Sequence, residues 1–313
     1  MYTIIVPLDG SEFAEHAIGL GQLLAETLGG VLELVTVLEE PVLLDLTPGV
    51  VLPNRLAAER YLNSIAEKLE TTAECRTTVL RGVPVDEILS IAAAQEDTII
   101  AMSTHGRSGV ARFTFGSVAD KITRGASCPV ALVRGTVDTV SWKVRKALVP
   151  LDGSEFGESA IPLAQALADG DGGEIHLLRV VPAFWSAPYV AYGPEAMYLN
   201  ADQIAELTEE AQQEARAYLE EMATVARAAG ARVTWEVRVG RAADEIIRVA
   251  ETVEPDIIVL SSHGRGGFRR WALGSVADEV LHRSTTPILV VPPKAASQVE
   301  LRSVKTHAAG QHG

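Results

Sequence analysis

Short runs of apolar residues alternate with longer amphipathic segments along this chain, and the whole alternation occurs twice. The run Thr3–Leu8 is apolar at nearly every position, which is typical of a strand buried on both faces of a sheet. The next segment, Phe13–Leu28, has apolar residues three and four positions apart, which predicts a helix that ends at Gly29 and Gly30. The same pattern predicts further strands at 31–38, 77–81, 98–103 and 129–134, and further helices at 56–69, 86–94 and 117–124.

The second half of the chain repeats this order of elements from Lys146, with a longer second helix over Gln203–Ala229. Strands separated by helices predict right-handed crossovers and a parallel sheet with helices on both faces. We therefore expect an α/β protein made of two tandem, doubly wound domains.

Two sequence motifs occur in both halves. The octapeptide VPLDGSEF stands at Val6–Phe13 and again at Val149–Phe156. The segment STHGRSGVARFTFGSVAD, starting at Ser103, is answered by SSHGRGGFRRWALGSVAD, starting at Ser261. The spacing between copies is larger for the second motif, so the second half carries an insertion, which we place around Pro182–Asn200.

Two copies of one domain explain the length of 313 residues. We place the domains at residues 1–137 and 144–293. Residues 294–313 lack apolar periodicity, so we expect a flexible tail there.

The charge balance limits the partners. Basic side chains number 27 and acidic ones 41, which gives a formal net charge of −14. Such a chain repels a phosphate backbone, so nucleic acid is excluded as the main partner. A local phosphate site stays open, because backbone amides and a few arginines can build one. With 47% hydrophobic and 22% charged residues, disorder of the whole chain is also excluded.

The cysteine count and the lengths of the apolar runs indicate in which cellular compartment the protein is expected. Cys75 and Cys128 are the only two cysteines, too few for a disulfide framework or a cysteine-based zinc site. The first residues lack the pattern of a signal peptide, and no apolar run approaches the roughly 20 residues that cross a bilayer. We expect a cytoplasmic protein that does not bind membranes.

The repeated motifs fall where ligands bind in doubly wound sheets, beyond the carboxyl ends of the strands. Asp9 and Asp152 end the first strand of each half and are suited to accept hydrogen bonds from ribose hydroxyls. A Gly-Ser pair opens the fourth helix of each half, and a helix N-terminus favours phosphate. Arginines in the preceding loop add positive charge; these are Arg107, Arg112, Arg265 and Arg270.

Each of these features has a purely structural alternative. The sequence Ser117-x-x-Asp120 matches a capping box, in which the serine only caps its helix, and the second half has the same pattern at Ser275. Asp9, followed by Gly-Ser, fits simple turn and N-cap chemistry. Apolar and aromatic residues at 42–52 and 184–192 are candidate lids or interface packing.

Several catalytic classes lack their motifs. The chain has no P-loop, no Gly-x-Gly-x-x-Gly after the first strand, no Gly-x-Ser-x-Gly and no His-Glu-x-x-His. The repeated residues supply no nucleophile with a positioned base. His105 and His263 fit loop-ordering hydrogen bonders better than metal ligands, because no second ligand stands at a suitable spacing.

One spacing occurs in both halves. Gly106 is followed by nine residues and then Gly116-Ser117, and Gly264 is followed by nine residues and then Gly274-Ser275. With Pro-x-Asp after the first strand, this pattern resembles the universal stress protein family over nearly the whole chain, twice. The resemblance implies two five-stranded parallel sheets with strand order 3-2-1-4-5, the adenine nucleotide alpha-hydrolase-like fold. It also implies ATP or another adenine nucleotide as the ligand.

The resemblance assigns a role to each matching position. It implies ribose contacts from Asp9 and Asp152 and adenine contacts from the backbones of Val37 and Val180. The implied phosphate sites consist of Gly106, Gly116, Ser117 and Val118, and of Gly264, Gly274, Ser275 and Val276. The remaining nucleotide-binding positions are Pro7, Leu8, Met102, Ser103, His105 and Arg107, with Pro150, Leu151, Leu260, Ser261, His263 and Arg265. A Mg²⁺ or Mn²⁺ ion would be held through the phosphates.

One position departs from the family pattern. The family's first glycine is Ser103 in the first half and Ser261 in the second. A serine adds a Cβ and a hydroxyl where the backbone approaches the nucleotide. This would weaken the binding of ATP or favour an adenine nucleotide with a different number of phosphates. Because both halves share the change, we interpret it as a tolerated variant.

Three functions are compatible with these features. The first is a stress-response sensor or regulator that binds adenine nucleotide and relays its state to an unknown protein partner. The second is a slow ATPase or autokinase that uses the histidines or Ser117 and Ser275. The third is a structural partner protein with vestigial sites. By analogy with the family, the two domains would pair as a pseudo-dimer through their fifth strands, and a homodimer is open.

Overall fold

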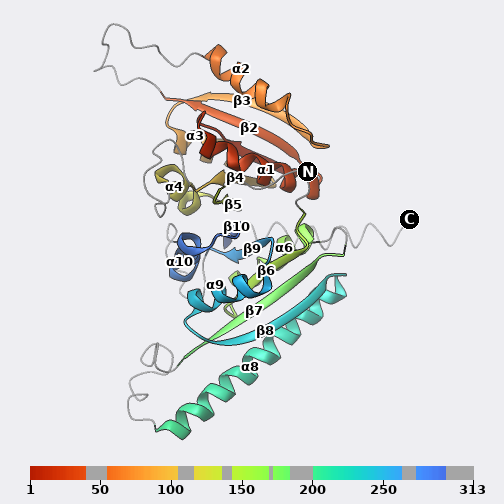
Figure 1. Ribbon diagram of the computed structural model, residues 1–313, viewed down its shortest axis with the longest axis vertical. Coiled ribbons are helices and arrows are strands. Elements are labelled where there is room, and N and C mark those ends of the chain that lie inside the picture. The colour runs from red at the N-terminus through yellow and green to blue at the C-terminus, as the bar shows by residue number, and fades with distance from the viewer. Residues whose placement is uncertain are drawn as a thin grey trace. The chain divides into compact units, whose positions relative to one another are not determined.

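The computed structural model describes residues 1–39, 55–104, 116–135, 143–168, 172–183, 200–262 and 273–293. The chain divides into two compact units, a first unit over Met1–Lys143 and a second unit over Val144–Gly313 (Figure 1). The expected tail at 294–313 lies outside the described residues, and so do the candidate lids at 42–52 and 184–192.

The first unit contains one parallel sheet with strand order β3-β2-β1-β4-β5. Its strands are β1 (Thr3–Pro7), β2 (Val31–Leu38), β3 (Glu74–Arg81), β4 (Thr98–Ser103) and β5 (Val130–Val133). Its helices are α1 (Glu12–Thr27), α2 (Arg55–Ala66), α3 (Pro84–Ala93) and α4 (Ser117–Gly125).

The second unit has the corresponding order, β8-β7-β6-β9-β10, and all its strand pairs are parallel. Its strands are β6 (Lys146–Leu151), β7 (Glu174–Pro182), β8 (Arg232–Gly240), β9 (Ile257–Ser261) and β10 (Ile288–Val291). Its helices are α5 (Glu155–Glu158), α6 (Ile161–Ala168), α8 (Ala201–Ala228), α9 (Ala242–Val253) and α10 (Ser275–Arg283). The prediction of two doubly wound parallel sheets is confirmed.

The apolar runs form the centre of each sheet. Ile4, Ile5 and Val6 of β1 are completely buried, and every residue of β4 is buried. Because helices cover both faces of these strands, neither face needs polar side chains. This explains why the central strands read as uninterrupted apolar runs.

Helices cover the two faces of each sheet in pairs. Right-handed crossovers place α1 and α2 on one face of the first sheet and α3 and α4 on the other. The contact between Tyr61 of α2 and Glu15 of α1 agrees with this, as does the packing of α3 against α4. In the second unit, α9 likewise packs against α10.

Several element bounds differ from the sequence prediction by one to three residues; the second helix, for example, ends at Ala66 rather than Leu69. Two differences have a clear physical cause. Strand β3 begins at Glu74 rather than Thr77. The sequence pattern missed this start because the first residues of the strand are exposed or half-buried and so form no apolar run. The first helix of the second unit is interrupted between α5 and α6. Pro162 explains the break, since it has no N–H to donate to the carbonyl of Glu158.

No helix within the described ranges is both long and apolar enough to span a membrane.

Candidate functional site

A tight Asp-Gly-Ser turn connects β1 to α1. The Asp9 carboxylate oxygen Oδ1 accepts hydrogen bonds from the Ser11 amide at 3.0 Å and from the Ser11 hydroxyl at 2.6 Å. The Ser11 hydroxyl in turn accepts from the amide of Ala14 at 3.2 Å, which caps α1. Gly10 between them has φ of 81°, a conformation that glycine adopts without the strain of a side chain.

The second unit builds the same turn after β6. Asp152 Oδ1 accepts from the amide of Ser154 at 3.1 Å and from its hydroxyl at 2.5 Å, and Ser154 caps α5 through the amide of Gly157 at 3.1 Å. Gly153 has φ of 76°. The turn and N-cap interpretation of this motif is therefore confirmed in both units. The turn fixes the orientation of each carboxylate at the end of its strand.

The helix that follows β4 starts without a side-chain cap. Gly116 is the N-cap residue of α4, with φ of −64° and ψ of 141°, and it has no side chain to bond the first turn. The Gly116 amide donates to the Thr104 carbonyl at 2.8 Å, and the first helical bond runs from the Asp120 amide to the Gly116 carbonyl at 2.9 Å. The amides of the first turn therefore receive no bond from an N-cap side chain.

The capping-box interpretation of Ser117 and Ser275 is wrong. Each serine is the first residue of its helix, one position after the N-cap glycine. Gly274 repeats the geometry of the first unit, with φ of −60°, ψ of 145° and an amide bond of 2.8 Å to the Ser262 carbonyl. The hydrogen bond from the glycine amide to the residue after the strand holds the glycine at the N-cap position. The serine is therefore the first helical residue and its hydroxyl does not cap the helix.

The turn and the helix start lie at the same edge of each sheet. Strand β1 pairs with β4 in parallel, so the residues that follow their carboxyl ends are neighbours. Asp9 follows β1, and Gly116 is bonded to the residue that follows β4. In the second unit β6 and β9 bring Asp152 and Gly274 to the same edge.

The other predicted positions are found around this edge where the structure describes them. Ser103 and Ser261 are the last residues of β4 and β9, and Met102 and Leu260 are buried just before them. Val37 and Val180 lie near the carboxyl ends of β2 and β7. The ends of β1 and β6 hold Pro7, Leu8, Pro150 and Leu151, and the second residues of α4 and α10 are Val118 and Val276. Eight candidates lie outside the described residues: His105, Gly106, Arg107, Arg112, His263, Gly264, Arg265 and Arg270.

Comparison with known proteins gives the family. A sequence profile of the Universal stress protein family matches residues 1–134 and, a second time, residues 143–292. The chain belongs to the universal stress protein family. It contains two domains of this family in tandem.

Individual relatives agree. A universal stress protein of Mycobacterium tuberculosis (strain ATCC 25618 / H37Rv) is 29% identical over 222 residues, which cover 69% of this chain and 68% of that protein. A universal stress protein of Methanocaldococcus jannaschii is 32% identical over 147 residues, 47% of this chain and 81% of that protein. The solved structure of a universal stress protein from Archaeoglobus fulgidus DSM 4304 has a TM-score of 0.64 at 22% identity, over 93% of this chain and 96% of that chain, which shows a shared fold.

Both universal stress protein domains contain a tyrosine–glutamate pair that the sequence did not reveal. The Tyr61 hydroxyl of α2 donates to Glu15 of α1 at 2.8 Å, and the Tyr218 hydroxyl of α8 donates to Glu158 of α5 at 3.1 Å. Partial burial, followed by the hydrogen bond and charge of Glu15, raises the pKa of Tyr61. Burial and then the charge of Glu158 raise the pKa of Tyr218. The phenols therefore stay protonated and act as donors.

These pairs lie beside the strand-end turns. The charge of Asp9 and the backbone of Gly10 both act on the Tyr61 phenol, and the charge of Asp152 acts on Tyr218. Each pair thus joins the second helix of its domain to the first helix, next to the candidate ribose acceptor. The repeat within the sequence contains a signal for these pairs, because the Tyr-Leu dipeptide at Tyr61 recurs at Tyr218 in the corresponding helix of the second half.

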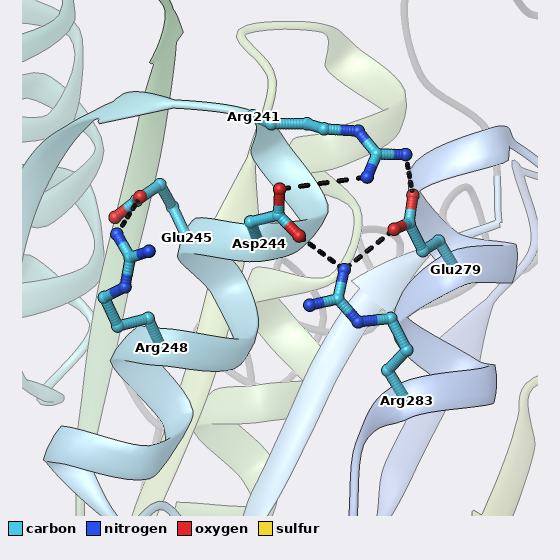
Figure 2. A network of polar contacts seen from close by, with 6 residues as sticks. All are labelled: Arg241, Asp244, Glu245, Arg248, Glu279 and Arg283. Carbon is cyan, nitrogen blue, oxygen red and sulfur yellow. Dashed lines mark hydrogen bonds and ion pairs between the residues drawn. The ribbon is translucent and has the colours of Figure 1, made fainter.

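In the second unit, the middle and the end of α10 form ion pairs with the start of α9. Arg241, the N-cap residue of α9, and Asp244 of α9 form ion pairs with Glu279 and Arg283 of α10, which we call the α9–α10 network (Figure 2). The Arg241–Glu279 contact is 2.6 Å, Arg283–Asp244 is 2.5 Å and Arg283–Glu279 is 2.7 Å. The hydrogen bond from Arg283 lowers the pKa of Asp244. The network ties the helix that begins at Gly274 to its neighbour.

The described residues contain no group of three or more histidine, cysteine, aspartate or glutamate side chains suited to a metal ion.

Proposed function

We propose that each unit binds ATP or a related adenine nucleotide, and that the protein acts as a nucleotide-dependent sensor or regulator in a stress response. The observation that supports this most is the pairing of a strand-end carboxylate with an uncapped helix N-terminus, present in both units. An uncapped first turn offers amide donors and the positive end of the helix dipole, which suit phosphate. A fixed carboxylate at the neighbouring strand end suits ribose hydroxyls.

The proposed roles follow from position. Asp9 and Asp152 accept from the ribose, and the strand-end backbones at Val37 and Val180 contact adenine. The first turns of α4 and α10 hold phosphate through their amides, starting at Gly116 and Gly274. The loops between β4 and α4 and between β9 and α10 add their glycines and arginines. Membership of the universal stress protein family supports this assignment.

The acidic charge of the chain implies a role for a cation. With a net charge of −14, the protein must hold a polyanion through local groups. Amide donors, the loop arginines and a divalent ion bound to the phosphates would offset the repulsion. Removal of Mg²⁺ and Mn²⁺ with a chelator should therefore weaken the binding of ATP more than the binding of adenosine.

Binding can be tested on purified full-length chain by isothermal titration with Mg-ATP and by mass spectrometry of co-purified ligand. We expect adenine nucleotide in the extract and two sites per chain. Gly116→Val and Gly274→Val should each remove one site, because the added side chain occupies the approach to the first turn. Both glycines have ordinary backbone angles, so valine fits without backbone strain.

A control is Ala228→Val, which adds the valine side chain at the exposed last residue of α8, away from the carboxyl ends of the strands, and should leave both sites intact. Absence of nucleotide in the extract, together with no heat of binding for Mg-ATP, would contradict the proposal.

A further inference from the structure

The two candidate sites differ in a charged residue on the strand beside the Asp-Gly-Ser turn. The strand next to the Asp-Gly-Ser turn carries Thr36 in the first unit and Arg179 in the second. Both side chains bond to the same backbone group of their unit. The Thr36 hydroxyl donates to the Leu8 carbonyl at 2.9 Å, and the Arg179 guanidinium donates through Nη1 to the Leu151 carbonyl at 3.1 Å. A neutral donor and a cationic donor thus fill one structural position.

The surroundings place the Arg179 guanidinium among the acidic groups of the second site. It lies over the ring of Tyr218, with 5.7 Å from Cζ to the ring centroid. The Tyr218 hydroxyl donates to Glu158, and the charges of Arg179 and Asp152 both act on this phenol. The carbonyl that Arg179 binds belongs to Leu151, the residue directly before Asp152.

The first unit keeps the acidic groups and the tyrosine without this cation at the matching position. Tyr61 bonds to Glu15 and feels the charge of Asp9, while Thr36 is buried and neutral. The strand-end cluster therefore has two carboxylates in the first unit, and two carboxylates with one guanidinium in the second. A polyanionic ligand meets less repulsion at the second cluster.

We infer that Arg179 is a specificity-determining residue that makes the second unit the tighter site for nucleotides in proportion to their phosphate charge. This rests on the proposed function, since it names which of the two sites prefers the more highly charged ligand. The guanidinium acts through its charge and through the carbonyl beside Asp152. Adenosine, which is neutral, should therefore bind both units alike.

The experiment isolates each site in the full chain. Gly274→Val leaves the first site and Gly116→Val leaves the second, and both are titrated with Mg-ATP, AMP and adenosine at low and high salt. At low salt we expect Mg-ATP to bind the second site about tenfold more tightly than the first, and this ratio to shrink in 0.5 M salt because exposed charges are screened. For adenosine we expect a ratio close to one.

Exchange of the residue at this position tests the cause. Arg179→Thr introduces the residue that the first unit uses, so the Leu151 carbonyl keeps a donor, and the ATP preference of the second site should disappear. Arg179→Lys should retain most of the preference because it retains the charge. Arg216→Thr removes an equal charge from the exposed part of α8 and should change neither site.

The possible outcomes separate the two proposals. If the unmodified chain binds neither Mg-ATP nor adenosine, the proposed function fails. If both sites bind ATP with equal affinity, the proposed function stands and the role of Arg179 is overturned. The same holds if Arg179→Thr weakens the binding of adenosine as much as the binding of ATP.

Discussion

The helices α4 and α10 each follow an N-cap glycine of the same geometry but are held by different contacts. In the second unit, ion pairs link α10 to α9. The positions involved are Arg241, Asp244, Glu279 and Arg283, and the aligned positions of the first unit are Val83, Asp86, Lys121 and Gly125. Within the described part of α4, Arg124 instead pairs with Asp120 of the same helix at 2.8 Å.

The Asp-Gly-Ser turn and the uncapped helix start are nevertheless the same in both units. The φ and ψ angles of Gly116 and Gly274 differ by only a few degrees, although the ion pairs differ. The geometry of the strand ends is therefore set by backbone hydrogen bonds and by the turn. The ion pairs join the later residues of α10 to α9, and the helix start has the same geometry without them.

The largest expected loss of stability comes from removing the tyrosine–glutamate hydrogen bond, which both units contain. Tyr61→Phe and Tyr218→Phe each remove a hydrogen bond to a partly buried carboxylate, and each should lower the free energy of unfolding of its own unit by about 1.5 kcal/mol. Amide hydrogen exchange resolved by peptide would show faster exchange in α2 for the first variant and in α8 for the second. Equal exchange in both variants and the unmodified chain would mean that the pairs contribute nothing.

A smaller effect separates true caps from the serines that only resemble them. Ser11→Ala and Ser154→Ala remove an N-cap and should each cost about 1 kcal/mol in urea unfolding. Ser117→Ala and Ser275→Ala should change stability by less than about 0.5 kcal/mol, as is usual for surface positions. A loss at Ser117 as large as that at Ser11 would show that the serine caps α4 in solution.

The smallest effect should come from the α9–α10 network, because its side chains are exposed and solvent screens their charges. Arg283 lowers the pKa of Asp244, so the stability from this pair is present above the unfolded-state pKa of about 3.9 and is lost as pH falls through the lower folded-state value. We expect α10 to exchange more slowly than α4 at pH 6, and this difference to shrink below pH 3.

Asp244→Asn provides the matched test, because it should reduce the protection of α10 at pH 6 and abolish the further change with acid. If α10 and α4 already exchange at the same rate at pH 6, the network does not stabilise α10.

The sequence predicted the parts of the fold that depend on continuous burial. β1 and β4 are buried on both faces, so their apolar runs stand out, and the duplicated motifs placed the strand ends. The start of β3 was missed because Glu74 lies on an exposed part of an edge strand, where polar residues are expected.

The candidate site was predicted only where its residues are close in sequence. Asp9 and Ser11 share one short motif, whereas Tyr61 and Glu15 meet only because α1 and α2 cover the same face of the sheet. The capping error has another origin. The pattern Ser-x-x-Asp does not say which residue takes the cap position, and the bond from Gly116 to Thr104 decides this in the folded protein.

The turn that ends β1 has a consequence for the entropy of ligand binding. A free aspartate side chain must give up rotamer freedom when it accepts a hydrogen bond, and that loss opposes binding. In this protein the chain has already restricted Asp9 during folding, through two bonds from Ser11. A hydroxyl that reaches this carboxylate meets an acceptor whose direction is set beforehand, so the ordering cost is met by the stability of the domain, and Asp152 repeats the arrangement in the other half of the chain.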